Sequence, residues 1–221
     1  MKIGIIGLGL IGGSFAISAK EHIKDCICYG QDVSEKHLNK AFDLNLIDEI
    51  LNKKKYCLMD VIILAVPVDI AYNIIVSLLD LVNDNALIID VGSIKNNICQ
   101  KVSIHPKRNQ FLATHPIAGT EYSGPEAAFE NLFYDQNQII CESNKTRPDL
   151  LEWALNWFSQ MSMRVLEMSP EEHDEHIAYV SHLSHISSFM LGKTVIEKEK
   201  DEEAIFDMAG SGFASTVRLA K

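Results

Sequence analysis

The chain has 221 residues, of which 47% are hydrophobic, and its formal net charge is −10. The hydrophobic fraction is large enough for a substantial core and argues against an intrinsically disordered chain. The negative charge argues against nucleic acid and anionic membrane surfaces as partners, so an anionic small-molecule substrate would need a local cationic group.

Short β-branched runs alternate with longer helical patterns over the first three quarters of the chain. The short runs are apolar throughout, which is typical of parallel strands buried on both faces. The predicted strands cover residues 2–6, 26–30, 61–66, 86–91, 110–114, 138–141 and 164–167. The predicted helices between them cover residues 11–21, 35–44, 70–81, 95–102 and 149–161. This order indicates an α/β fold class, a Rossmann-type sheet with right-handed crossovers.

The strand pattern stops near Met168, and an all-helical C-terminal region is predicted to follow. Ser169 and Pro170 open a helix, because serine is a good cap and proline suits the first helical position. This helix is predicted to reach about residue 198, and a second short one to cover residues 201–208. We therefore expect two domains, a dinucleotide-binding domain over residues 1–168 and a helical domain over residues 169–221.

The first predicted strand ends in GLGLIGG, which places three glycines in GxGxxG spacing. The spacing alone is weak, but here it follows a strand, opens a helix and precedes Asp32 at the end of the next strand. Asp32 would bond the ribose hydroxyls and repel a 2′-phosphate, and no arginine follows it closely, so NAD is predicted as the cofactor. The predicted contacts of the glycine turn are Gly7, Leu8, Gly9, Leu10, Ile11 and Gly12.

Three later strands end at the same predicted edge, in LAVPV with Val66 and Pro67, in VGSIK with Ser93 and in THPIAGTEYSG with His115. Ligands of open α/β sheets bind beyond the carboxyl ends of strands, so these residues should face the nicotinamide half of the cofactor. A neutral imidazole can take a proton from a hydroxyl while hydride leaves the same carbon, which makes His115 a candidate base. Ordinary turn chemistry at Val66-Pro67 and a structural histidine at position 115 are the alternative interpretations.

The helical region contains the histidine-rich segment HDEHIAYVSHLSH. His182 and His185 lie three residues apart and so on neighbouring faces of one helix. No metal site is predicted, because HExxH is absent and no acidic residue lies at a useful spacing; one or two of these histidines could bind substrate instead. Near the end of the chain, Arg218 is either an exposed surface residue or a bidentate clamp for a carboxylate.

The five cysteines show neither a CxxC pair nor a zinc-ligand spacing, so we expect them to be reduced. The N-terminus runs directly into MKIGIIGLG, and we expect no signal peptide. The longest apolar run, VIILAVPV, is too short to span a bilayer. These features predict a soluble cytoplasmic protein without a membrane partner.

Taken in order, the motifs resemble the prephenate dehydrogenase family, including its arogenate-using relatives. The matching segments are GLGLIGGSFA, LAVPV, DVGSIK, THPIAGTEYSGPEAA, VSHLSH and GSGF...TVRLA. The resemblance implies an NAD-dependent oxidoreductase that converts prephenate to 4-hydroxyphenylpyruvate by oxidative decarboxylation, in tyrosine biosynthesis. Arogenate as substrate and an NAD-binding sensor without turnover are alternatives. A further alternative is a 3-hydroxyacid or imine reductase type of dehydrogenase, which would need a lysine near the hydride site, such as Lys95.

The resemblance also implies roles for single residues. His115 matches the catalytic histidine that hydrogen-bonds the ring 4-hydroxyl, and Ser93 matches the serine that helps to hold both groups. The residues implied to bind the substrate or to gate access to it are Glu121, Ser181, His182, His185 and Arg218. Relatives usually continue through several more helices that form a dimer interface. We therefore expect a homodimer if such helices are present, and we expect that the helical part of this chain is either truncated or reduced.

Overall fold

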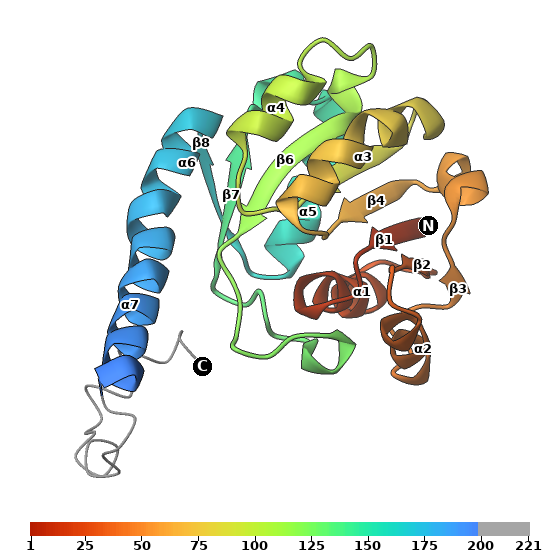
Figure 1. Ribbon diagram of the computed structural model, residues 1–221. Helices are drawn as coiled ribbons and strands as arrows, with labels where there is room; N and C mark the ends of the chain where they lie inside the picture. The colour runs from red at the N-terminus through yellow and green to blue at the C-terminus, as the bar shows by residue number, and fades with distance from the viewer. Residues whose placement is uncertain (199–221) are drawn as a thin grey trace. The chain divides into compact units, whose positions relative to one another are not determined.

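An eight-stranded sheet forms the centre of the first part of the protein (Figure 1). The structure, a computed structural model, describes residues 1–198, without the side chains of residues 181, 182, 185 and 196–198. The strand order is β3-β2-β1-β4-β5-β6-β7-β8. In chain order the strands are β1 (Lys2–Ile6), β2 (Ile27–Gln31), β3 (Glu49–Ile50), β4 (Val61–Leu64), β5 (Leu87–Asp90), β6 (Phe111–Pro116), β7 (Asn137–Cys141) and β8 (Arg164–Met168).

The predicted α/β fold class is confirmed, and all seven predicted strands are present. β3 was not predicted, because it has only two residues and both are exposed. β1 to β6 pair in parallel, whereas β7 is antiparallel to β6 and parallel to β8. A parallel neighbour requires a crossover, usually a helix, and the β6–β7 connection contains only the short 3-10 turn η3 (Pro125–Ala127). The chain therefore reverses direction at β7.

Helices cover both faces of the sheet. α1 (Leu10–His22), α2 (Glu35–Asp43) and α5 (Pro148–Gln160) contribute to one apolar cluster, which includes Phe15, Trp157 and Phe158. α3 (Val68–Leu81) and α4 (Asn96–Val102) contribute to a second cluster, which includes Ile75 and Leu79. Because both faces are covered, the ends of the strands are where a ligand can reach the sheet.

The predicted long helix after Ser169 consists of three pieces in the structure. α6 (Pro170–Ile177) and α7 (Leu183–Lys198) are joined by the π-helical segment Ala178–His182. A π-helical turn widens the hydrogen-bond ring from i−4 to i−5, which hydrophobic periodicity does not reveal. The second helix predicted over residues 201–208 lies outside the described residues.

The chain divides into two compact units, Met1–His173 and Asp174–Lys221. The first unit therefore includes the first turn of α6 as well as the sheet. Its last residue, His173, is 2% exposed and hydrogen-bonds a side chain of β6. Within residues 1–198, no helix is both long and apolar enough to cross a membrane. All five cysteines are free thiols.

Candidate functional site

The carboxyl ends of four parallel strands meet at one edge of the sheet. The last residues of β1, β4 and β5 lie side by side, since Ile6 pairs with Leu64 and Leu64 pairs with Asp90. Asp90 pairs in turn with Ala113 of β6, so that β6 continues past its neighbours to His115. The turns after β1, β4 and β5 and the end of β6 thus share the edge at which open α/β sheets bind ligands.

The glycine turn after β1 has the geometry of a phosphate cradle. Gly7 has φ +95°, a conformation that favours glycine, and a Cβ there would overlap the carbonyl oxygen of Ala65. A Cβ on Gly12 would overlap the carbonyl oxygen of Gly7, so α1 can pack against the glycine turn only because residue 12 has no side chain. Gly9 caps α1 without a side-chain hydrogen bond, and no atom lies within 4 Å of a Cβ placed there. The first N–H groups of α1 therefore face an open space suited to an anion.

The second and third glycines of the motif, Gly9 and Gly12, predict different effects of adding one methyl group. Gly12→Ala is expected to destabilise the fold by about 1–3 kcal/mol or more, because the new Cβ must displace backbone. Gly9→Ala is the matched control and should leave Tm unchanged, since its Cβ meets no protein atom. Thermal unfolding of the two variants checks this, and an equal loss of Tm in both would contradict the packing described for the turn.

Asp32 follows β2 and is bound to the glycine turn. Its carboxylate accepts N–H bonds from Leu8 at 2.8 Å and from Ser34 at 2.9 Å. Its side chain is 10% exposed, and Nδ1 of His37 lies 3.6 Å from one carboxylate oxygen. Each carboxylate oxygen can accept more than one hydrogen bond, so Asp32 can still accept from a ligand hydroxyl. The residues of this turn therefore fit the adenosine side of a dinucleotide.

The turn after β4 packs directly on the glycine turn. Pro67 caps α3 with φ −49°, the value that the proline ring imposes. A Cβ on Gly7 would lie 3.1 Å from Cγ1 of Val66. Val66 is half-buried and Pro67 is exposed, which places the two predicted residues at the edge of the sheet beside the cradle. Ser93, also half-buried, lies in the next turn along this edge, after β5.

A buried ion pair lies beneath the end of β6. Lys95 is fully buried and Asp90 is 1% exposed, and the ammonium of Lys95 bonds the carboxylate of Asp90. The same ammonium donates to the carbonyl oxygen of Thr114 at 2.6 Å, and the Thr114 hydroxyl donates to the carbonyl of Asp90 at 2.9 Å. These bonds fix the backbone that precedes His115. The sequence feature that could have indicated this ion pair is the segment DVGSIK, in which an Asp and a Lys lie five residues apart at the end of a strand.

The thiol of Cys99 lies one helical turn after Lys95. Burial, and to a smaller extent the nearby carboxylate of Glu142, raises the pKa of this thiol to about 12. A thiol with such a pKa stays protonated near neutral pH and is a poor nucleophile. Cys99 is therefore part of the core behind the site and not of its chemistry.

His115 is half-buried at the end of β6 and is joined to a second histidine. Its Nδ1 lies 2.9 Å from Nε2 of His173, with the two rings at 73°. His173 is placed by the start of α6, where the Ser169 hydroxyl accepts from the backbone of Glu172 at 3.1 Å. In the sequence, His173 is the first of the histidines in the segment HDEHIAYVSHLSH, and no separate role was predicted for it. Its contact with His115 could not be predicted, because 58 residues separate them.

The connection between β6 and β7 carries Glu121 and runs back toward α1, the helix that follows the glycine turn (Figure 1). Its turn η3 packs against α1 and α2, and the N–H of Phe129 donates to the Ser14 hydroxyl at 3.2 Å. Gly124 has φ +86°, so the connection needs a glycine there. Glu121 is exposed and lines a hollow of about 700 Å³ with neighbouring residues of this connection.

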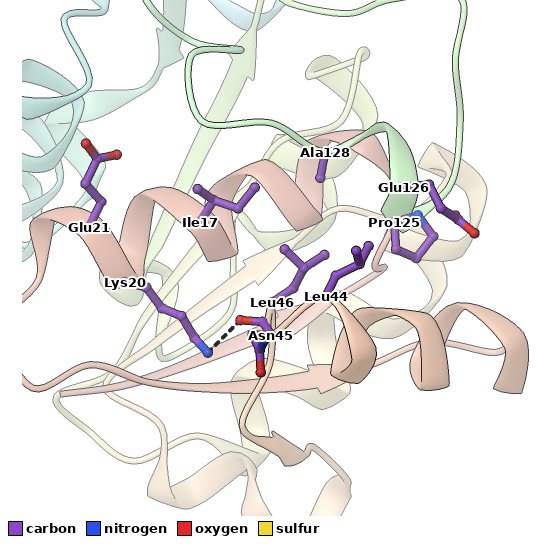
Figure 2. Close-up of a pocket in the computed structure, with 9 residues that line it drawn as sticks. All are labelled: Ile17, Lys20, Glu21, Leu44, Asn45, Leu46, Pro125, Glu126 and Ala128. Carbon is purple, nitrogen blue, oxygen red and sulfur yellow. Dashed lines mark hydrogen bonds between the residues drawn. The ribbon is translucent and has the colours of Figure 1, made fainter.

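A groove of about 480 Å³ lies between α1, η3 and the turn after α2 (Figure 2). Figure 2 shows that Lys20 points from α1 toward Asn45. Its ammonium donates to the Asn45 carbonyl at 2.8 Å and to Asp48 at 2.7 Å. The positive charge of this groove is thus neutralised within the fold. We therefore place the candidate active site at the carboxyl edge of the sheet and not in this groove.

The predicted residues of the helical region are only partly placed. Ser181 and His182 belong to the π-helical segment, a feature frequent at functional sites, and His185 belongs to α7. The side chains of these three residues and the whole of Arg218 lie outside what the structure describes. Among the described residues, no group of three or more His, Cys, Asp and Glu side chains could hold a metal ion.

Comparison with known proteins identifies the family. Residues 15–167 match the model of the prephenate dehydrogenase nucleotide-binding domain, and residues 169–221 match that of its dimerization domain. A prephenate dehydrogenase from Bacillus subtilis is 31% identical over 98% of this chain, which covers 59% of that protein. A cyclohexadienyl dehydrogenase from Zymomonas mobilis is 29% identical over 99% of this chain, which covers 75% of that protein.

A solved structure agrees with these sequence relatives. The crystal structure of A. aeolicus prephenate dehydrogenase in complex with hydroxyphenyl propionate and NAD+ superimposes with a TM-score of 0.89. The two chains are 31% identical, and the match covers 100% of this chain and 78% of that one. With the family model of the first domain matching more than half of its residues, this chain belongs to the prephenate dehydrogenase family.

Proposed function

We propose that this protein is an NAD-dependent oxidoreductase that oxidises and decarboxylates prephenate to 4-hydroxyphenylpyruvate. The observation that carries the proposal is the position of His115, at the end of β6 and on the same sheet edge as the glycine turn. Membership of the family supports the reaction class, and the NAD+ of the A. aeolicus complex supports the cofactor. The relative from Zymomonas mobilis is a cyclohexadienyl dehydrogenase, so arogenate is the alternative substrate.

The cofactor would occupy the edge formed by the first turns after β1, β2, β4 and β5. The N–H groups at the start of α1 would hold the pyrophosphate, and Asp32 would accept hydrogen bonds from the adenosine ribose. Val66, Pro67 and Ser93 would contact the nicotinamide half. When bound, NAD supplies the acceptor for the hydride that leaves the substrate.

His115 would act as the base for the ring 4-hydroxyl of the substrate. It takes the hydroxyl proton while hydride leaves the same carbon, and a carbonyl forms there. Loss of the ring carboxylate as CO2 sends its electron pair into the ring, which becomes aromatic and leaves a phenolate oxygen. His115 can then return the proton to that oxygen. Ser93 is proposed to hold the hydroxyl and the imidazole together.

The two carboxylates of prephenate require cationic partners, because the net charge of the chain is −10. Lys95 cannot supply this charge, since it is fully buried and paired with Asp90. We propose Arg218 as the ligand of a substrate carboxylate, with His185, Ser181 and His182 on the substrate side of the helical region and Glu121 on the connection that controls access. The burial of Lys95 also disfavours a lysine-dependent dehydrogenase, in which that ammonium would have to reach the substrate.

The two domains are proposed to have different binding roles. Residues 1–168 would bind NAD, and residues 169–221 would complete the substrate site and take part in a homodimer. The match of the second segment to a dimerization domain supports this assembly. Light scattering of the purified protein tests it, and a monomer at micromolar concentration would count against the homodimer.

One assay separates the candidate functions. Purified protein is incubated with NAD and prephenate, and the absorbance of the reduced nicotinamide is followed, with arogenate and NADP in parallel reactions. Turnover of prephenate with NAD supports the proposal, whereas faster turnover of arogenate reassigns the substrate. If NAD binds in calorimetry but neither substrate is turned over, a cofactor sensor is the better description.

The carboxylate of Asp32 is expected to decide between NAD and NADP. Asp32→Asn removes the negative charge that would bond the ribose hydroxyls, so the KM for NAD should rise by about 10- to 100-fold, equivalent to the ~1.5–3 kcal/mol of a charged hydrogen bond. The preference for NAD over NADP should fall by a similar factor, because repulsion of a 2′-phosphate is lost. Glu35→Gln, which neutralises an exposed acid three residues away on α2, is the matched control. An unchanged ratio in Asp32→Asn would remove Asp32 from the ribose site.

A further inference from the structure

We infer, on the basis of the function proposed above, that His173 is a positioning residue that fixes the tautomer of His115. Nδ1 of His115 and Nε2 of His173 are 2.9 Å apart, within hydrogen-bonding distance. The rings meet edge-on at 73°, with centroids 5.1 Å apart. His173 is 2% exposed and His115 is half-buried, so the His173 side of this contact is shielded from water. The inference is that Nδ1–H of His115 donates to Nε2 of His173.

The direction of this hydrogen bond decides whether His115 can act as a base. A neutral imidazole has one N–H donor and one acceptor nitrogen. If His115 donates from Nδ1, its Nε2 carries a lone pair and can accept the proton of a substrate hydroxyl. If His173 donates instead, Nε2 of His115 carries the hydrogen and the base is lost. A partner that accepts at Nδ1 therefore selects the active tautomer.

The setting of His173 favours the acceptor role. His173 is 2% exposed, and its neutral ring can accept at Nε2, whereas an imidazolium could only donate. The residue also lies in the first turns of α6, where the positive end of the helix dipole opposes a further positive charge. Glu171 and Glu172 in the same turn are exposed to solvent, which screens their opposite effect. The Lys95–Asp90 pair under His115 has no net charge.

The same contact would stabilise His115 after it has taken the proton. The imidazolium form of His115 keeps its Nδ1–H, and a hydrogen bond from a charged donor is stronger than one from a neutral donor. His173 would thus orient the ring before the proton moves and stabilise the charge afterwards. It does not touch the reacting atoms in this scheme, and its whole effect passes through His115.

Two substitutions separate this role from simple packing. His173→Phe keeps an aromatic ring but removes the acceptor, and kcat is expected to fall by about 10- to 100-fold, the usual effect of losing an outer partner of a functional histidine. His173→Gln supplies an amide oxygen as the acceptor and should recover most of that loss. The KM for NAD should change little in either variant. His22→Leu, which removes a histidine at the far end of α1, is the matched control and should keep wild-type kcat.

A double-variant cycle completes the test. In a His115→Asn background, His173→Phe should cause no further fall in kcat, since its effect requires the His115 ring. Wild-type kcat in His173→Phe, equal losses in the Phe and Gln variants, or an additive loss in the double variant would each overturn the inference. If His173→Phe does not fold, His173→Met serves as the variant without the acceptor. Full activity of His115→Asn alone would instead overturn the proposed function.

Discussion

Replacing His115 with asparagine is expected to lower kcat with prephenate by about 10²- to 10⁴-fold, the range that general-base catalysis contributes. Asparagine preserves a polar side chain at the end of β6 but cannot take up a proton near neutral pH. The affinity for NAD should be unchanged, because the glycine turn and Asp32 belong to other strand ends. Steady-state kinetics with prephenate, together with calorimetry of NAD binding, measures both quantities.

The dependence of the rate on pH gives an independent check on His115. Only the neutral imidazole can accept the hydroxyl proton, so kcat of the wild-type protein should fall as the pH drops into the range in which histidine becomes protonated. The residual activity of His115→Asn should lack this fall. Unchanged turnover in His115→Asn, or the same acidic fall in the variant, would assign the base to another residue.

The parts of the site that were predicted from the sequence are those carried by local chemistry. Glycines at fixed spacing after an apolar run predict a cradle because such a turn needs residues without a Cβ, and in the structure a Cβ on Gly7 or on Gly12 would overlap a backbone carbonyl. The pair His115-Pro116 at the end of an apolar run likewise predicts that His115 lies at the carboxyl end of its strand. The carboxyl edge then follows from the parallel order of β1, β4, β5 and β6.

The parts that were missed depend on contacts between distant segments. The partner of His115 lies 58 residues away at the start of α6, and nothing in the spacing of either residue points to the other. The antiparallel entry of β7 depends on a connection without a crossover helix, and apolar strands have the same pattern in either direction. Lys95 looked available to a substrate because lysines are usually exposed, yet here it is fully buried.

The buried pair Lys95–Asp90 predicts the largest loss of stability from a single substitution. Lys95→Met is expected to lower the free energy of unfolding by about 3–5 kcal/mol, because it leaves a carboxylate that is 1% exposed without its cation. The Thr114 carbonyl also loses its donor, so the end of β6 should move and kcat should fall together with stability. Urea unfolding measures the first effect and steady-state kinetics the second.

Two further variants separate burial of the charge from loss of the lysine itself. The double variant Asp90→Leu/Lys95→Met removes both charges and should recover much of the stability lost in Lys95→Met, since an apolar pair of similar volume is often as stable as a buried ion pair. Lys20→Met breaks an ion pair whose side chains are 28% and 41% exposed, and it should cost at most about 1 kcal/mol. If Lys95→Met were no more destabilising than Lys20→Met, the pair would not hold the end of β6. Recovery of stability without recovery of kcat in the double variant would instead show that the bond to Thr114, which lies next to His115, is what the active site requires of Lys95.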